Sequence, residues 1–181
     1  MIGVQAFGSD GWEWFTEPAE WTLDDDGLTV HTDAGSDFWR TTHYGFIRDN
    51  GHILGRWTEG DFTLQATFAG QYTHQYDQAG IALRIDAENW VKTGIELVDG
   101  QYQQSVVVTR GVSDWSVVPV PDAANVTIRA TRAGDTVTVY AGGTMLRLAY
   151  LPPAVPVHAG VMCASPDGPG YRVRFSAVSL G

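Results

Sequence analysis

The chain has 181 residues, of which 44% are hydrophobic and 18% charged, a composition that excludes a disordered protein. Its formal net charge of -10 would repel phosphate backbones and anionic lipids, so we expect neither a nucleic acid nor a membrane as partner. The single cysteine, Cys163, allows no internal disulfide, and the first ten residues lack the pattern of a signal peptide. We therefore expect a soluble, cytoplasmic protein with a single domain over residues 1–181.

Alternation of polar and apolar side chains predicts β-strands from one end of the chain to the other. The three clearest cover residues 61–69, 78–85 and 90–98. Others are expected, in chain order, at residues 28–32, 101–110, 125–132, 136–141, 145–151, 157–163 and 171–178. Turn sequences such as Asp99-Gly100 and Gly142-Gly143 separate them at intervals of about ten residues. So many strands in one domain favour two stacked antiparallel sheets with almost no helix.

Alternate residues of a strand point to opposite faces, and on the three clearest strands one face is apolar. This face predicts the core between the sheets, namely Phe62, Leu64, Phe68, Ile81, Leu83, Ile85, Val91, Ile95 and Leu97. The opposite face carries Gln78 and Arg84 on one strand and Lys92 and Glu96 on the next. Glycines are interspersed on that face, and a glycine inside a strand marks a bulge or the close approach of a ligand or another backbone. We expect these four side chains to converge on one ligand groove; an ordinary solvated face is the alternative.

Lys92 is the only lysine among eleven basic residues. A lysine offers a compact, titratable point charge, which an arginine fork does not. Its place on the glycine-rich face favours contact with an anionic or hydroxyl group, and chance is the alternative explanation.

Three blocks of the sequence resemble one known family: residues 37–45, residues 76–96 with the run YDQAGIALRID, and residues 105–116. The chain resembles, over about residues 10–178, the family of unknown function that includes the fungal "regulation of enolase" protein. That resemblance implies an all-β, concanavalin A-like lectin/glucanase sandwich, a two-sheet antiparallel jelly roll with a concave sheet. The blocks supply Trp39, Tyr76, Gln78, Lys92, Glu96, Ser105 and Trp115, and the family attaches no assigned chemistry to them. A shared fold does not transfer an activity.

Catalytic and metal motifs are not found in the sequence. The Glu-x-Asp-x-x-Glu arrangement of retaining glucanases is missing, so Glu96 would need a second carboxylate from another strand, such as Asp37 or Asp114. The five histidines form no metal-binding pattern, and Asp24-Asp25-Asp26-Gly27 reads as a turn. We expect no metal and no cofactor, and the sequence assigns no catalytic residue.

Seven tryptophans are many for this length, and exposed aromatic faces stack on the apolar faces of sugar rings. Trp39, Trp57, Trp90 and Trp115 lie near polar residues and are the candidates for such stacking. We expect a non-catalytic domain that binds a carbohydrate or small polar metabolite on the concave sheet. The expected ligand-binding residues are Trp39, Tyr76, Gln78, Arg84, Lys92, Glu96, Ser105 and Trp115. The alternatives are a glycan-acting hydrolase or lyase with Glu96 as acid or base, and a module that binds a protein partner.

Overall fold

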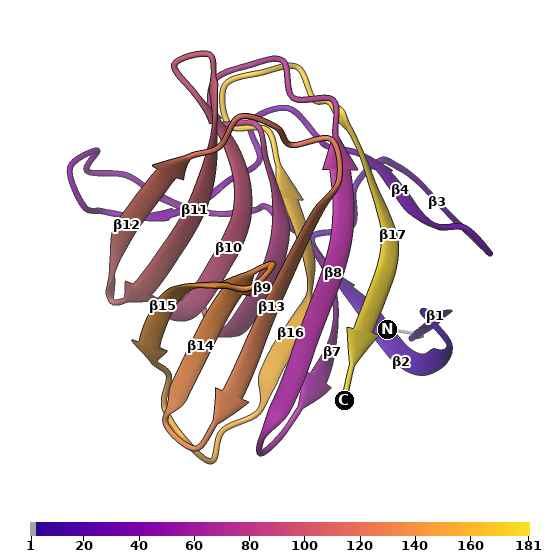
Figure 1. Cartoon of the computed structure of the whole chain (residues 1–181), viewed down its shortest axis with the longest axis vertical. Helices are drawn as coiled ribbons and strands as arrows, with labels where there is room; N and C mark the ends of the chain where they lie inside the picture. Colours follow the sequence, from indigo (N-terminus) through magenta and orange to yellow (C-terminus); the bar gives the residue numbers. More distant parts are fainter. Residues whose placement is uncertain (1–2) are drawn as a thin grey trace.

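The computed structural model describes residues 3–181, and within them every regular element is a β-strand. Two large antiparallel sheets lie face to face (Figure 1). The prediction of a two-sheet antiparallel sandwich is confirmed. In the described part of the chain, no helix is long and apolar enough to cross a membrane.

The larger sheet has eight strands and carries the candidate site. In spatial order they are β1 (Val4–Ala6), β2 (Ser9–Phe15), β7 (His52–Thr58), β16 (Val157–Ala164), β9 (Gln78–Asp86), β10 (Asn89–Val98), β11 (Gln101–Arg110) and β12 (Val112–Pro119). The strands β9 to β12 follow one another in the chain as a meander, because tight turns such as Asp99-Gly100 connect antiparallel neighbours.

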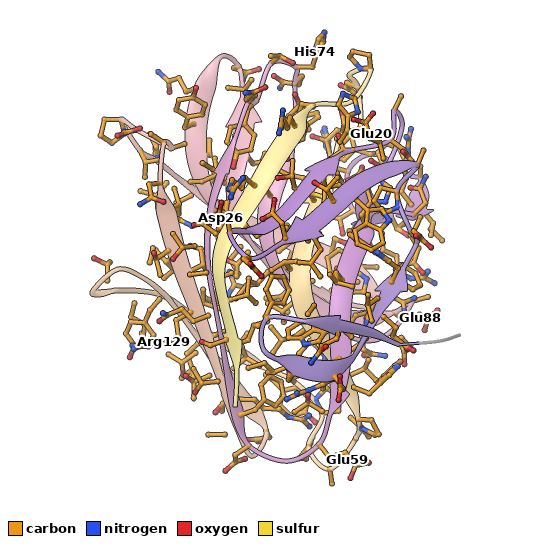
Figure 2. The ribbon with its side chains drawn as sticks, turned by 90° about the vertical axis from the view of Figure 1, so that its right-hand side faces the viewer. Glu20, Asp26, Glu59, His74, Glu88 and Arg129 are labelled. Atoms are coloured by element: carbon orange, nitrogen blue, oxygen red, sulfur yellow. The ribbon has the colours of Figure 1, made fainter. Side chains whose placement is uncertain are left out.

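The second sheet has seven strands and closes the core from the other side. In spatial order they are β15 (Thr144–Tyr150), β14 (Thr136–Ala141), β13 (Val126–Ala133), β8 (Phe62–Gly70), β17 (Arg172–Leu180), β4 (Gly27–His31) and β3 (Glu20–Asp24). Charged side chains such as Glu20, Asp26 and Glu59 stand at the periphery of the sandwich (Figure 2). The high acidic charge is thus carried largely on the outside.

The predicted core lies between the two sheets. Leu64, Phe68, Ile81, Leu83 and Val91 are completely buried there. Phe62 and Ile95 are buried as well, and Ile85 and Leu97 pack against the same cluster while remaining partly accessible. The parity predicted from alternation is therefore confirmed.

A short hairpin covers part of the outer face of the larger sheet, meaning the face that points away from the core. It consists of β5 (Phe38–Arg40) and β6 (Ile47–Asp49), which pair only with each other. Phe38 is buried against Trp90 and Met162 in a second, smaller apolar cluster on that face. Trp90 is consequently 3% exposed and forms part of this packing, so it offers no face for stacking on a ligand.

The strand glycines serve the sheet itself. Gly80 of β9 and Gly94 of β10 are directly opposite each other, and a Cβ on either would clash with the backbone of the other strand. Of the roles expected for glycines on this face, these two have the close approach of another backbone, because they allow two neighbouring strands to come together.

Candidate functional site

A pocket of ≈ 210 Å³ lies between the outer face of the larger sheet and the β5–β6 hairpin. Its floor is polar and buried, and consists of Asp37, Gln78, Lys92 and Glu96, each less than 10% exposed. Strand pleating explains part of this floor, because Gln78, Lys92 and Glu96 share the face that alternates with the core positions. Asp37 comes from the segment that leads into β5.

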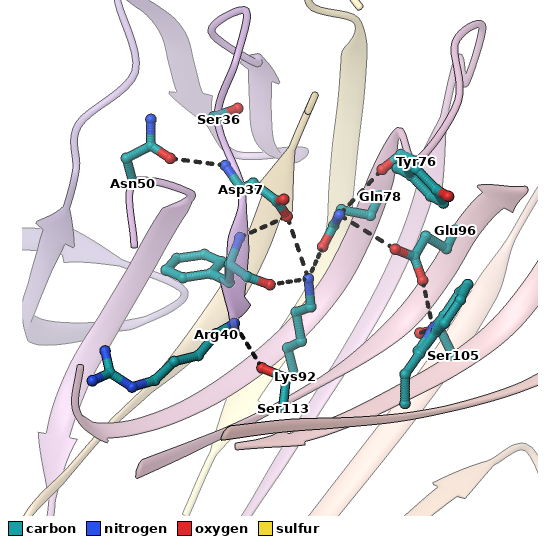
Figure 3. A network of polar contacts seen from close by, with 12 residues as sticks. Ser36, Asp37, Arg40, Asn50, Tyr76, Gln78, Lys92, Glu96, Ser105 and Ser113 are labelled. Carbon is teal, nitrogen blue, oxygen red and sulfur yellow. Dashed lines mark hydrogen bonds and ion pairs between the residues drawn. The ribbon is translucent and has the colours of Figure 1, made fainter. Parts of the chain in front are cut away.

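Lys92 is at the centre of a network of polar contacts (Figure 3). Its Nζ donates hydrogen bonds to the Phe38 carbonyl at 2.8 Å and to Gln78 Oε1 at 2.5 Å. The same nitrogen lies 3.7 Å from Asp37 Oδ1, which forms an ion pair with it. A buried ammonium has to be paired and hydrogen-bonded to be tolerated, and these partners satisfy that need. Lys92 thereby ties the hairpin to the sheet.

Glu96 is the third buried ionisable residue of the floor, beside Asp37 and Lys92. The Trp115 indole donates a hydrogen bond to Glu96 Oε2 at 3.0 Å, and Gln78 Nε2 lies 3.5 Å from Glu96 Oε1. Burial raises the pKa of Glu96, while the Lys92 ammonium and hydrogen bonds from Ser105 and Trp115 act in the opposite direction. Glu96 is therefore easier to protonate than an exposed glutamate.

Aromatic side chains form the walls above this floor. Trp39 and Tyr44 come from the hairpin and its loop, Tyr76 precedes β9, and Trp115 lies on β12. The Tyr44 and Tyr76 hydroxyls are 3.2 Å apart and share a hydrogen bond. That bond, together with burial, raises the pKa of Tyr44 to about 12, so Tyr44 is uncharged at neutral pH. The remaining lining residues are Phe46, Arg48, Pro166 and Asp167.

The structure brings together most of the side chains that the sequence singled out. Trp39, Tyr76, Gln78, Lys92, Glu96 and Trp115 all line the pocket. Ser105 lies beneath its wall, where its hydroxyl accepts a hydrogen bond from the Trp115 indole at 3.1 Å.

Arg84 is placed outside the pocket. Its guanidinium forms a bidentate contact with Asp49, at 2.7 and 3.3 Å, and lies over the ring of Phe15. Its parity on β9 is as expected, yet Gln78 and Arg84 are six residues apart along the strand, which separates them by about 20 Å. The groove expected for four charged and polar side chains therefore includes only Gln78, Lys92 and Glu96 of that set.

Several lining residues were missed by the sequence reasoning: Asp37 as part of the floor, and Tyr44, Phe46, Arg48, Pro166 and Asp167. Asp37 had been named only as a partner for Glu96. Asp114, the other carboxylate named for that role, is exposed and forms an ion pair with Arg147 outside this pocket. The sequence signal that could have identified part of this wall is the high number of aromatic residues in 38–46, a segment that lacks the alternation of a strand.

The floor retains hydrogen-bonding capacity for a ligand. Asp37 Oδ2 makes no hydrogen bond within residues 3–181, and each Glu96 oxygen has a second lone pair. Lys92 has a third N–H, since its Asp37 contact is longer than a hydrogen bond. Acceptors and a donor under aromatic walls suit a molecule with several hydroxyl groups. Residues 3–181 contain no group of three or more His, Cys, Asp or Glu side chains placed to hold a metal ion.

Comparison with known proteins gives one clear family match. A family model described as "Protein of unknown function (DUF1349)" matches residues 14–181. "Regulation of enolase protein 1" of Saccharomyces cerevisiae is 38% identical over 173 residues, which is 92% of this chain and 87% of that protein. A crystal structure of a functionally unknown S. cerevisiae protein matches with a TM-score of 0.90 and 37% identity, covering 94% of this chain and 95% of that one.

More distant structures share the fold alone. The carbohydrate-binding module CBM66 from Bacillus subtilis has a TM-score of 0.59 at 13% identity, covering 92% of this chain and 94% of the module. The GH43 BlXynB protein of Bacillus licheniformis has a TM-score of 0.69 at 14% identity, and the match covers 93% of this chain but 36% of that protein. These are β-sandwich folds of the kind predicted from the sequence.

Proposed function

The chain belongs to the family of proteins of unknown function DUF1349, as its sequence resemblance predicted, and for this member we propose binding of a carbohydrate in the pocket under the β5–β6 hairpin. The observation that carries the proposal is the combination of aromatic walls with a buried polar floor. A sugar ring has apolar faces that pack on aromatic rings and hydroxyls that need fixed donors and acceptors.

Each part of the pocket has a role in this proposal. Trp39 and Trp115 contact the ring faces, Asp37 and Glu96 accept hydrogen bonds from hydroxyls, and Lys92 donates one. The floor groups are already held by one another, so little side-chain freedom is lost when the ligand binds. The sandwich fold that the chain shares with CBM66, a carbohydrate-binding module, is compatible with this role.

The experiment is a calorimetric titration of the purified protein with neutral saccharides. The series comprises mono- and oligosaccharides of glucose, galactose, mannose, xylose, arabinose and fructose. Trp115→Ala should weaken binding by about tenfold or more, because it removes a wall and the indole donor to Glu96. Trp57→Ala is the matched control, since Trp57 is 49% exposed and lies outside the pocket. Equal affinities of the two variants, or no binding of any saccharide, would refute the proposal.

A second candidate function is hydrolysis or elimination on a glycan, with Glu96 as the acid or base. The observation that favours it is a buried carboxyl of raised pKa in the same pocket as a second carboxylate, Asp37. A general acid works best with a pKa near the working pH, which is above the pKa of an ordinary glutamate. Burial raises the pKa of Glu96 towards that range. Incubation with the same oligosaccharides and chromatography of the products tests this. Turnover that is lost in Glu96→Gln while binding persists would establish it, and unchanged oligosaccharides would exclude it.

A further inference from the structure

The four aromatic walls of the pocket form a closed ring. Trp39 and Tyr44 meet edge to face, with ring centroids 5.6 Å apart, and Trp39 meets Trp115 in the same manner at 6.4 Å. Trp115 meets Tyr76 at 6.4 Å, and the Tyr76 hydroxyl is hydrogen-bonded to that of Tyr44. Each wall thus contacts the next, and the last contacts the first.

This ring surrounds a space that ends at the buried floor. The floor residues Asp37, Gln78, Lys92 and Glu96 are 3–8% exposed, whereas Tyr44 in the wall is 42% exposed. The pocket therefore deepens from the aromatic ring towards the floor. Its volume of ≈ 210 Å³ is below the roughly 300–1,000 Å³ typical of sites for drug-sized ligands. There is room for about one sugar ring.

We infer that the pocket accepts the terminal unit of a saccharide chain and excludes internal units; this inference rests on the proposed carbohydrate binding. An internal unit has a neighbour on both sides and needs a groove that is open at two ends. The closed ring of Trp39, Tyr44, Tyr76 and Trp115 leaves no second exit, so only a unit with one neighbour fits.

The test measures how many protein molecules bind one chain. Linear oligosaccharide series of xylose, arabinose, galactose, mannose, glucose and fructose, from the dimer to long chains, are titrated in a calorimeter, and the mass of each complex is checked by analytical ultracentrifugation. Terminal binding predicts at most two proteins per linear chain, one for each end, a number that stays the same at every length, and competition by the corresponding free monosaccharide. A number of bound proteins that rises with chain length would overturn the inference while leaving carbohydrate binding intact. If no series and no monosaccharide binds, the proposed function itself fails.

A variant that opens the ring gives a second readout. Tyr44→Ala removes one wall together with its hydrogen bond to Tyr76, and should let longer chains place internal units in the pocket. We expect about tenfold weaker binding of short oligosaccharides and a number of bound proteins that rises with chain length. Tyr150→Ala is the matched control, because Tyr150 is 43% exposed and lies on β15, away from the pocket. Identical stoichiometry and affinity in Tyr44→Ala and Tyr150→Ala would overturn the inference.

Discussion

Replacing Lys92 with methionine keeps the length of the side chain and removes its charge and its donors. In the folded protein this leaves the Phe38 carbonyl and Gln78 Oε1 without the hydrogen bonds that they accept at 2.8 and 2.5 Å. It also removes the ion-pair partner of Asp37, which is 8% exposed. Lys92 itself is 3% exposed, so water replaces these contacts only in part, from the side of the pocket.

The size of the effect follows from those contacts. Each buried acceptor left without a donor costs about 1–3 kcal/mol. Removing one partner of a buried ion pair costs about 3–5 kcal/mol, part of which is offset here because the lysine no longer has to be desolvated. We expect Lys92→Met to lower the free energy of unfolding by about 3 kcal/mol, and to weaken saccharide binding as well.

Urea unfolding measures this change, because urea does not screen charges as guanidinium chloride does. Arg84→Met is the matched control on the adjacent strand: its ion pair with Asp49 is more accessible and lies outside the pocket, so we expect a loss of about 1 kcal/mol and unchanged saccharide binding. A loss below about 1 kcal/mol in Lys92→Met would refute the view that Lys92 holds the hairpin on the sheet.

Further predictions concern the core and the buried titratable groups. Leu83→Ala should cost about 2–5 kcal/mol in urea unfolding, because Leu83 is completely buried between the sheets; a loss below about 1 kcal/mol would count against its assigned face. Because the pKa of Glu96 is raised in the folded protein, protonated Glu96 stabilises the fold fully at low pH, and this stabilisation is lost as pH rises through that pKa. Glu96→Gln should therefore reduce the fall in the free energy of unfolding with rising pH. Identical pH profiles of the variant and the wild type would contradict this. Burial lowers the pKa of His52, which accepts a hydrogen bond from the Asp33 amide and contacts the Thr16 carbonyl. Neutral His52 stabilises the fold fully above about pH 6.5, and this stabilisation is lost as pH falls from there through the lowered pKa. The urea midpoint should therefore drop between pH 7.5 and 5.5, and it should drop less in His52→Gln.

The sandwich was predictable from sequence because strand pleating has a period of two. Leu64, Ile81, Leu83, Val91 and Ile95 take the face that alternation assigns to them, and their burial fixes the register of β8, β9 and β10. The same parity places Gln78, Lys92 and Glu96 together on the outer face. Local pattern was sufficient for both results.

The cover over that face was not predictable in the same way. The β5–β6 hairpin is held by contacts distant in sequence, such as Lys92 to Phe38 and Arg40 to Glu88. No periodicity in residues 32–51 reports these contacts, so the sequence predicts a ligand groove on the sheet without the hairpin that covers it in the structure and without the burial of Lys92. Arg84 illustrates another limit: alternation gives the face of a residue but neither its partners nor the position of a pocket along the strand. Arg84 lies about 20 Å along β9 from Gln78 and pairs with Asp49 of the hairpin.

The central claim, that a saccharide occupies the aromatic pocket, is tested most directly by the tryptophan indole signals in a ¹H–¹⁵N spectrum. The Trp39 and Trp115 indoles line the pocket and donate to Thr42 and Glu96 respectively. The Trp12 indole belongs to the buried core on β2, outside the pocket, and donates to Ser9. On titration with the saccharide that binds in calorimetry, we predict saturable shifts of the Trp39 and Trp115 signals and a stationary Trp12 signal. Unmoved Trp39 and Trp115 signals at saturation would contradict the claim.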